Sequence, residues 1–252
     1  MNDPIDRRRL IGGMALGASG LILSGCDSLN ANPDFRDILK GAEGLHRRAQ
    51  RMVAPGLARE YDRADMSPVF RTNGNRRPAS PEWAALAANN FEDWRLIVDG
   101  LVARPLRLSL RDMGSLPQRA QITRHDCVEG WSAIGKWQGP QLAAILRAAG
   151  LSSRARFIVF HCADDSGGRP YYESIDLDDA FHPQTIMAVL MNDHRLPVGH
   201  GAPTRLRVER QLGYKHAKFV MRIEARDSLD NLYGGKGGYW EDVGDYAWYA
   251  GI

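Results

Sequence analysis

Short apolar or alternating segments dominate the hydrophobic pattern of this chain, and they predict more strands than helices. Most of them run for four to seven residues and end at Gly, Asp or a charged residue, which is typical of strands in a compact domain. Strands are predicted at 94–100, 106–110, 121–124, 157–160, 205–209 and 218–224. The pattern therefore predicts an α+β fold in which short helices connect the strands.

Helical spacing is restricted to three places. Apolar residues recur every three or four positions between 30 and 56, which predicts an amphipathic helix or tether ended by Pro55-Gly56. Gly139-Pro140-Gln141 is expected to open a second helix that Gly150 closes, and 177–181 a short third one. The tail from 234 to 252 is rich in Trp and Tyr, so we expect it to pack back onto the domain.

Composition adds little to this picture. The 252 residues are 44% apolar and 25% charged, as in an ordinary globular protein, and suffice for one large domain with an appendage. The formal net charge of +3 is too small to indicate a nucleic-acid partner, and arginine pairs such as Arg47-Arg48 are expected to be solvated.

The first 26 residues have the build of an export signal. Arg7-Arg8-Arg9 precedes a short, glycine-rich apolar run, and an arginine pair at this position resembles the twin-arginine signal, which exports folded proteins. Leu23-Ser24-Gly25-Cys26 resembles a lipoprotein cleavage box with Cys26 as the lipid acceptor. We therefore expect a signal at 1–26, a tether and helix at 27–60, and a periplasmic domain at 61–252, with lipid anchoring through Cys26 as an option.

The segment from Arg124 to Trp131 carries the most chemistry. It places Cys127 among Arg124, His125, Asp126 and Glu129, and nearby positive charge favours the reactive thiolate form of cysteine. Three interpretations of Cys127 are open at this point. Cys127 is a ligand or nucleophile, it is half of a disulfide with Cys162, or it is a buried thiol beside solvated charges.

Two later segments share this polarity. His200 to Arg205 combines an imidazole, a glycine and a guanidinium just before a predicted strand, and Gly213 to Lys218 combines Tyr, Lys and His between two strands. Basic side chains and backbone N–H groups in loops beside a sheet suit an anionic ligand.

In this order, the motifs resemble those of the sulfite oxidase family of molybdenum–molybdopterin oxidoreductases, and more closely its bacterial periplasmic methionine-sulfoxide-reductase branch. The resemblance covers about two-thirds of the chain, from 67 to 227. Its most specific parts are Cys127-Val128-Glu129-Gly130-Trp131-Ser132, Met191-Asn192-Asp193 with Leu196-Pro197, Gly201-Ala202-Pro203 with Arg205-Leu206, and Gly213-Tyr214-Lys215 with Lys218.

The resemblance implies a role for each matching residue. Cys127 would give its thiolate to molybdenum, and a soft thiolate suits such a centre. The positions that match cofactor-binding ones are Asn73, Cys162, His200, Arg205, His216, Ala217 and Lys218. Arg124 is assigned a catalytic role, as an anion-attracting group beside the substrate, from its proximity to Cys127 alone.

One departure bears on the reaction. Val189 stands where sulfite oxidases have a tyrosine next to the metal, and valine can donate neither a proton nor a hydrogen bond. We therefore expect oxygen-atom transfer from a small or protein-bound S-oxide or N-oxide, with sulfite oxidation as the alternative. The chain has no Cys-X-X-Cys-His haem motif, so a separate haem or quinone-linked membrane subunit is expected to supply electrons.

Two further hypotheses stay open. The first is a cofactor-free thiol enzyme, in which Cys127 is the nucleophile and His125, His161 or His200 the base. The second is a lipid-anchored binding domain with a Cys127–Cys162 disulfide and no chemistry.

Overall fold

The computed structural model describes residues 33–53 and 56–252, and the side chains from residue 41 onward. The predicted twin-arginine signal and Cys26 lie outside the described residues. The described chain falls into two compact units, 33–53 and 56–252. The first unit is a single helix, α2 (Pro33–Val53), where the sequence predicts an amphipathic helix. No helix among the described residues is both long and apolar enough to cross a membrane.

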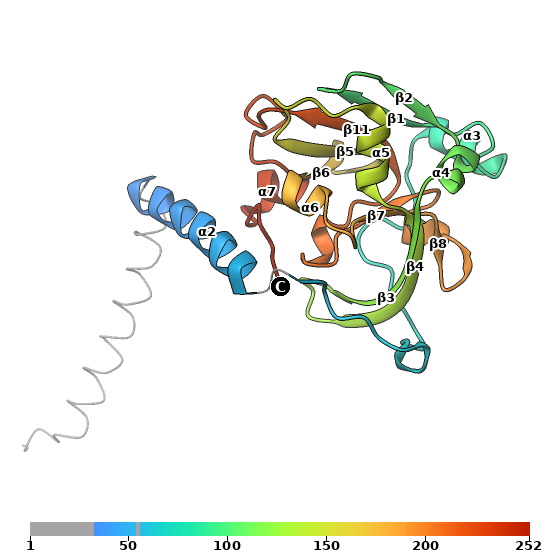
Figure 1. Cartoon of the computed structure of the whole chain (residues 1–252), viewed down its shortest axis with the longest axis horizontal. Coiled ribbons are helices and arrows are strands. Elements are labelled where there is room, and N and C mark those ends of the chain that lie inside the picture. Colours follow the sequence, from blue (N-terminus) through green and yellow to red (C-terminus); the bar gives the residue numbers. More distant parts are fainter. Residues whose placement is uncertain (1–32, 54–55) are drawn as a thin grey trace, which may run out of the picture. The chain divides into compact units, whose positions relative to one another are not determined.

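The second unit is built from mixed sheets (Figure 1). A five-stranded sheet has the order β2-β1-β11-β5-β6, in which only the β1–β11 pair is parallel. A four-stranded sheet has the order β3-β4-β8-β9, and β10 pairs with β7. The strands are β1 (Leu96–Gly100), β2 (Leu106–Leu108), β3 (Gln118–Asp126), β4 (Ser132–Pro140), β5 (Phe157–Ser166), β6 (Arg169–Asp176), β7 (Ile186–Ala188), β8 (Leu190–Met191), β9 (His194–Arg195), β10 (Arg205–Arg207) and β11 (Val220–Arg226).

Short helices connect these strands, as the α+β prediction requires. They are η1 (Arg63–Asp65), α3 (Pro81–Ala88), α4 (Leu110–Ser115), α5 (Leu142–Ala149), α6 (Leu177–Ala180), η2 (Val198–His200), η3 (Gly213–Lys215) and α7 (Tyr239–Gly244). The helix α5 shows why they form. Gln141 precedes it, Gly150 ends it in the left-handed region at φ 71°, and Leu142, Ile145 and Leu146 are buried on one side.

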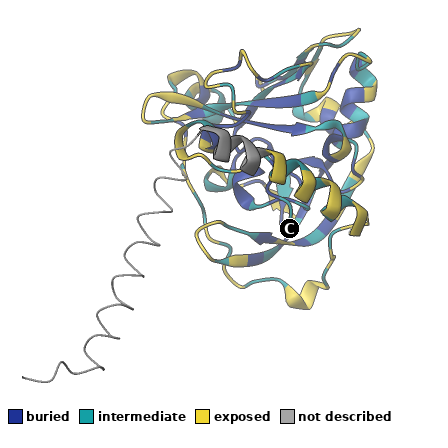
Figure 2. Cartoon of the chain, turned by 90° about the vertical axis from the view of Figure 1, so that its left-hand side faces the viewer, coloured by how far each residue is buried: buried dark blue, intermediate teal, exposed yellow. Residues whose placement is uncertain are grey.

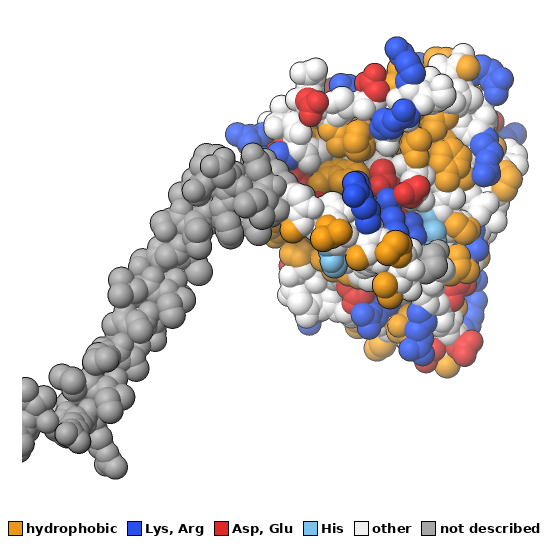
Figure 3. Space-filling view, turned by 60° about the vertical axis from the view of Figure 1, so that its left-hand side comes forward, with side chains coloured by type: hydrophobic (Ala, Val, Ile, Leu, Met, Phe, Trp, Pro, Cys, Tyr) orange, Lys and Arg blue, Asp and Glu red, His pale blue; other side chains and the backbone are white. Residues whose placement is uncertain are grey.

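The main core lies between the five-stranded sheet and α5, and buried positions concentrate in the strands (Figure 2). A second apolar cluster joins Val159 and Tyr172 of this sheet to Leu229 and Leu232 and to Tyr239 of the tail. The prediction that the tail packs back onto the domain is therefore confirmed. On the face shown in Figure 3, basic and acidic side chains are interspersed, as the small net charge leads one to expect.

Two local expectations need correction. Leu110 begins α4 instead of ending a strand, because Ser109 caps the helix by accepting a hydrogen bond from the Asp112 N–H. The strand β4 has no counterpart among the predicted strands, because two glycines and a proline interrupt its pattern. One of them, Gly139, is required by packing, since a Cβ atom there would lie 2.0 Å from the Met187 carbonyl oxygen.

Candidate active site

Cys127 lies in the loop that joins β3 to β4. The two strands pair over nine positions, up to Asp126 opposite Ser132. The Cys127 N–H donates to the Trp131 carbonyl oxygen at 2.9 Å, and the Gly130 N–H donates back to the Cys127 carbonyl at 3.0 Å. Gly130 has φ 84°, which a residue with a side chain rarely adopts. A long, fully paired ladder thus fixes the position of the thiol.

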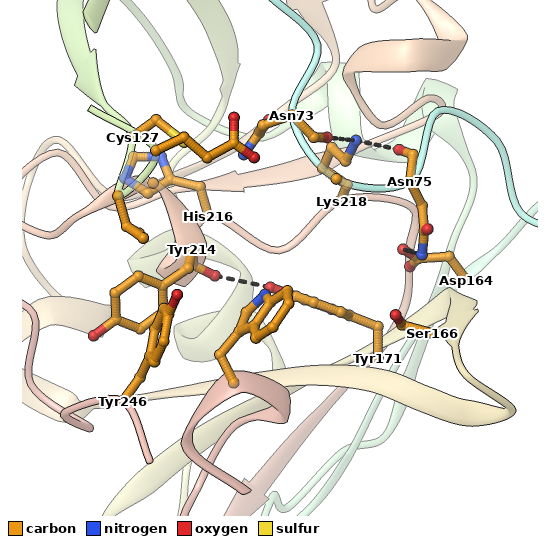
Figure 4. Close-up of a pocket in the computed structure, with 15 residues that line it drawn as sticks. Asn73, Asn75, Cys127, Asp164, Ser166, Tyr171, Tyr214, His216, Lys218 and Tyr246 are labelled. Atoms are coloured by element: carbon orange, nitrogen blue, oxygen red, sulfur yellow. Dashed lines mark hydrogen bonds between the residues drawn. The ribbon is translucent and has the colours of Figure 1, made fainter. Parts of the chain in front are cut away.

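The Cys127 loop forms one wall of a cavity of about 180 Å³ (Figure 4). The other walls come from the 73–75 loop, the ends of β5 and β6, the segment around η3, and the C-terminal tail. The lining residues are Asn73, Gly74, Asn75, Cys127, Val128, Glu129, Asp164, Ser166, Tyr171, Gly213, Tyr214, His216, Lys218, Trp240 and Tyr246. Segments separated by up to 170 residues therefore meet at one hollow.

Four of the predicted site residues line this cavity together: Asn73, Cys127, His216 and Lys218. Lys218 links two of its walls, because its ammonium donates to the carbonyl oxygens of Asn73 at 2.7 Å, of Gly199 at 3.1 Å, and of Asn75. None of these acceptors is a carboxylate. Burial, and next the charge of Arg205, lower the pKa of Lys218 to about 7.

Arg205 lies behind this wall and is fully buried on β10. Its guanidinium donates to the carbonyl oxygens of His200 and His216, each at 3.2 Å, while its Nε has no partner. Burial, and next the charge of Arg207, lower its pKa to about 9. By contrast, Arg207 forms a fully buried ion pair with Glu209 at 2.5 Å. Arg205 and Lys218 are thus buried cations held by carbonyl groups, an arrangement that an anionic ligand would complete.

Three histidines each have a buried ring nitrogen without a partner: His125 Nε2, His200 Nδ1 and His216 Nδ1. Of the three, only His216 lines the cavity. Arg207 donates to His125 Nδ1 at 3.0 Å, so the proton of the neutral His125 ring is on Nε2. His216 Nε2 faces the Gln211 carbonyl oxygen at 3.0 Å, so its Nδ1 is a free acceptor. Burial, followed by Arg207, lowers both pKa values well below 6.5. One ring donor, on His125, and one ring acceptor, on His216, therefore have no hydrogen-bond partner among the described residues.

The remaining predicted residues lie outside the cavity lining. Cys162 is half-buried on β5 and packs against the main core. Ala217 is buried in that core, where its carbonyl oxygen accepts the Leu206 N–H at 2.8 Å. His200 ends η2 and packs edge-on against Phe70. The Arg124 side chain is half-exposed and pairs with Asp126 at 2.9 Å, so its catalytic role stays a prediction.

The two cofactor-free hypotheses find no support in this geometry. Cys127 and Cys162 are both free thiols. Burial raises the pKa of the Cys127 thiol, so at neutral pH the uncoordinated sulfur keeps its proton. Within residues 41–53 and 56–252, no histidine hydrogen-bonds to the Cys127 sulfur, as a thiol nucleophile would require.

Sequence reasoning missed several lining residues. Asp164 lines the cavity, and one of its carboxylate oxygens is buried without a partner. Trp240 and Tyr246 come from the tail, whose packing is predictable but whose contact with the Cys127 loop is not. The Asp164-Asp165-Ser166 run after a buried strand was the available signal for the first. The aromatic composition of the tail was the only signal for the other two.

Comparison with known families identifies the family of this chain and its cofactor. The model of the oxidoreductase molybdopterin binding domain matches residues 84–233. The chain belongs to this family. It is a molybdenum-dependent oxidoreductase, and its cofactor is molybdenum–molybdopterin. The resemblance to the sulfite oxidase family, the α+β fold and the cofactor predicted from the motifs are thereby confirmed.

Individual relatives indicate which branch of the family the chain resembles. The chain is 42% identical over 198 residues to the protein-methionine-sulfoxide reductase subunit YedZ1 of Azospira oryzae, covering 76% of this chain and 70% of the relative. It is 33% identical over 153 residues to the protein-methionine-sulfoxide reductase catalytic subunit MsrP of Campylobacter jejuni, covering 56% of this chain and 52% of that protein. The sulfane dehydrogenase SoxCD of Paracoccus pantotrophus shares the fold, with a TM-score of 0.50 and 21% identity over 59% of this chain and 45% of its own. The chain thus spans about half the length of the last two.

The site residues of this oxidoreductase fit molybdopterin. The cofactor carries a phosphate and ring donors and acceptors, and the structure offers two buried cations that hydrogen-bond to carbonyl oxygens and three unpaired histidine nitrogens. Gly213 leaves room beside one of these rings, because a Cβ atom there would lie 2.5 Å from His125 Nε2. The described residues contain no group of three or more His, Cys, Asp or Glu side chains arranged to hold a metal ion.

Proposed function

We propose that this enzyme reduces methionine sulfoxide residues to methionine. The observation that carries the proposal is the 42% identity over 198 residues to a relative named as a subunit of a protein-methionine-sulfoxide reductase. The C. jejuni relative, matched over a shorter stretch, has a name of the same kind. Val189 supports sulfoxide reduction over sulfite oxidation, since it packs against the main core and offers no proton donor where sulfite oxidases have a tyrosine.

In this proposal Cys127 supplies the protein ligand to molybdenum, as the family resemblance implies. The position of its sulfur in the cavity wall supports this role. A thiol that is protonated when uncoordinated loses its proton on binding a metal. Arg205 and Lys218 hold the negatively charged part of the cofactor, His125 Nε2 donates a hydrogen bond to it, and His216 Nδ1 accepts one. When bound, the cofactor supplies two-electron oxygen-atom-transfer chemistry.

The net reaction is R₂S=O + 2 e⁻ + 2 H⁺ → R₂S + H₂O, in which the sulfur–oxygen bond breaks and the oxygen leaves as water. The protein must therefore receive two electrons. The chain has no Cys-X-X-Cys-His motif, so we assign the electrons to a haem or quinone-linked membrane subunit. The name of the C. jejuni relative, a catalytic subunit, supports the existence of a partner subunit.

The first 26 residues carry a proposal about location. We propose export to the periplasm by the twin-arginine route, which suits a protein that takes up its cofactor before transport, with Cys26 as a candidate lipid anchor. Labelling with a radioactive fatty acid in cells, for the wild type and for Cys26→Ser, tests the anchor.

The activity is tested on protein purified from a molybdenum-replete host. We expect stoichiometric molybdenum and pterin, and reduction of a methionine-sulfoxide peptide with a reduced viologen dye as electron donor. Sulfite oxidation with ferricyanide as acceptor is the alternative assay. A fully loaded enzyme that oxidises sulfite but leaves the sulfoxide unchanged would refute the proposal.

Two cysteine variants test the metal ligand. Cys127→Ser should abolish sulfoxide reduction and change the electron paramagnetic resonance spectrum of Mo(V), because a sulfur ligand is lost. Cys162→Ser is measured beside it, because the resemblance also matches Cys162 to a cofactor-binding position although its thiol is half-buried on β5 outside the cavity lining. An unchanged Mo(V) spectrum in Cys127→Ser would exclude Cys127 as the ligand.

A further inference from the structure

A buried ion cluster lies behind the wall of the cavity. Its members are Glu173 of β6, Lys215 of η3 and Glu241 of α7, and none of the three side chains is more than 1% exposed. The Lys215 ammonium lies 2.6 Å from Glu173 Oε2 and donates to Glu241 Oε1 at 2.5 Å. Three elements that are distant in sequence are therefore joined through one ammonium group.

The cluster also connects segments that line the cavity. Lys215 stands between Tyr214 and His216 in the chain, and Trp240 immediately precedes Glu241. Tyr214, His216 and Trp240 all line the cavity. A displacement of Glu241 would therefore carry Trp240 with it and change the shape of the cavity wall.

The charges of the cluster do not balance when both glutamates are ionised. Among the side chains that the structure describes, neither carboxyl forms an ion pair with a second cation. One negative charge would then remain uncompensated at full burial, which is costly. A single added proton makes the cluster neutral. The other titratable groups that interact with the two carboxyls or adjoin them are all acids: Cys162 of β5, Tyr171 and Tyr172 of β6, and Asp242 of α7.

Two oxygen atoms of the cluster offer a place for this proton. Glu173 Oε1 and Glu241 Oε2 are both buried without a hydrogen-bond partner. Both lie beside Gly238, because a Cβ atom there would be 2.6 Å from the first and 2.1 Å from the second. Burial, and next the charge of Glu241, raise the pKa of Glu173 well above 4.5, although the charge of Lys215 opposes them. A proton on one oxygen satisfies both atoms, since a protonated carboxyl donates and an ionised one accepts.

We propose that Glu173 and Glu241 share one proton, and that this proton latches α7 (Tyr239–Gly244) and its Trp240 onto the cavity wall. In the closed form the cluster is neutral. Loss of the proton leaves a buried negative charge, which is relieved when Glu241 moves into water together with α7, while Glu173 stays paired with Lys215. The inference does not depend on which substrate the enzyme reduces.

The direction of the pH dependence follows from where the proton is held. In the open form neither carboxyl needs the extra proton, and a glutamate in water loses it near pH 4.5. Above this value, and up to the raised pKa of Glu173, only the closed form keeps the proton. The closed form is therefore favoured at low pH. As pH rises, the ratio of open to closed form should increase by up to about tenfold per pH unit.

Hydrogen–deuterium exchange of the holoenzyme, followed in Tyr239–Gly244 between pH 5 and pH 9, tests the latch. After correction for the intrinsic exchange rate, the protection of this segment in the wild type should fall as pH rises. Glu173→Gln replaces the shared proton by an amide N–H, which donates to Glu241 at every pH. Its α7 should therefore stay protected at alkaline pH. Glu241→Gln makes the same replacement from the other side and provides a second variant should the first fail to fold.

Tyr172→Phe is the matched control. The Tyr172 hydroxyl donates to Asp242 of α7 at 2.5 Å, so the substitution removes a contact of the same helix. The phenol keeps its proton over this range, because burial raises the pKa of Tyr172. Protection of α7 should therefore fall by the same factor at every pH. Asp164, which also titrates, is unchanged in all of these proteins, so differences between them exclude it.

Infrared difference spectroscopy detects the proton directly. The wild type at neutral pH should show a protonated-carboxyl band that Glu173→Gln lacks. Absence of this difference would overturn the inference, as would the same pH dependence of α7 exchange in the wild type and in both glutamine variants. Loss of α7 protection at every pH in both glutamine variants would also contradict it, because the fully ionised cluster would then be the form that holds the helix.

Discussion

Gly213 lies against the imidazole of His125, so close that a Cβ atom at position 213 would be 2.5 Å from Nε2 and 2.6 Å from Cε1. The contact joins η3 to the end of β3, two segments about 90 residues apart in the chain. Residue 213 must therefore be a glycine for the His125 ring, a candidate cofactor contact, to keep its position.

Gly213→Ala should therefore displace the His125 ring and reduce molybdenum content. Overpacking of this kind costs about 1–3 kcal/mol of stability, and the displaced Nε2 can no longer reach the same ligand atom. Gly114→Ala is the matched control, because no atom lies within 4 Å of its Cβ position. Metal analysis and thermal unfolding of both variants check this. Full molybdenum content in Gly213→Ala would show that His125 is not a cofactor contact.

Lys215 and Lys218, three residues apart, should respond to substitution in opposite ways. Lys215→Met leaves Glu173 and Glu241 buried without a cation, which should cost about 3–5 kcal/mol of folding stability. Lys218→Met leaves only carbonyl groups unpaired, so the loss of stability should be about 1–3 kcal/mol while molybdenum content falls strongly. Denaturant titration and metal analysis separate the two effects. Equal losses of both quantities in both variants would contradict these roles.

Asp164 should make the stability of the cofactor-free protein depend on pH. Burial raises the pKa of its carboxyl from 3.8 to about 6. Between these values the folded carboxyl keeps a proton that the unfolded one has lost. Stability from this group is therefore present at low pH and is lost as pH rises from 4 to 6, by up to about 3 kcal/mol.

The comparison with Asp164→Asn isolates this effect, because the amide does not titrate. Unfolding free energies of the two proteins at pH 4, 5, 6 and 7 should show the wild type losing stability relative to the variant as pH increases to 6. A difference that is constant with pH would place the Asp164 carboxyl in an ordinary, solvated environment.

Local patterns made much of the fold predictable. The apolar segments at 157–160 and 218–224 begin or overlap β5 and β11, and helical spacing located α2 and α5. The strand β4 could not be predicted from local patterns, because contacts with residues distant in sequence require its glycines. A Cβ atom at Gly135 would lie 3.1 Å from the Phe70 ring, and one at Gly139 would meet Met187. Tertiary contact, rather than local propensity, decides this element.

The candidate site was likewise predictable only in part. Motif resemblance pointed to Cys127, Asn73, His216 and Lys218, which the fold brings to one cavity. It could not distinguish Lys215 from Lys218, since only the fold shows that the first forms ion pairs with two carboxylates while the second donates its hydrogen bonds to carbonyl oxygens. Asp164 was missed because its unpaired oxygen results from burial.

The position of Trp240 and Tyr246 beyond residue 233 has a consequence for how this oxidoreductase can change. Cys127, Arg205 and Lys218 lie inside the matched family region, whereas Trp240 and Tyr246 follow it. The cavity wall is thereby built from two stretches of the chain, one inside the matched family region and one beyond it. Substitutions in the last twenty residues can reshape this wall while Cys127, Arg205 and Lys218 stay unchanged.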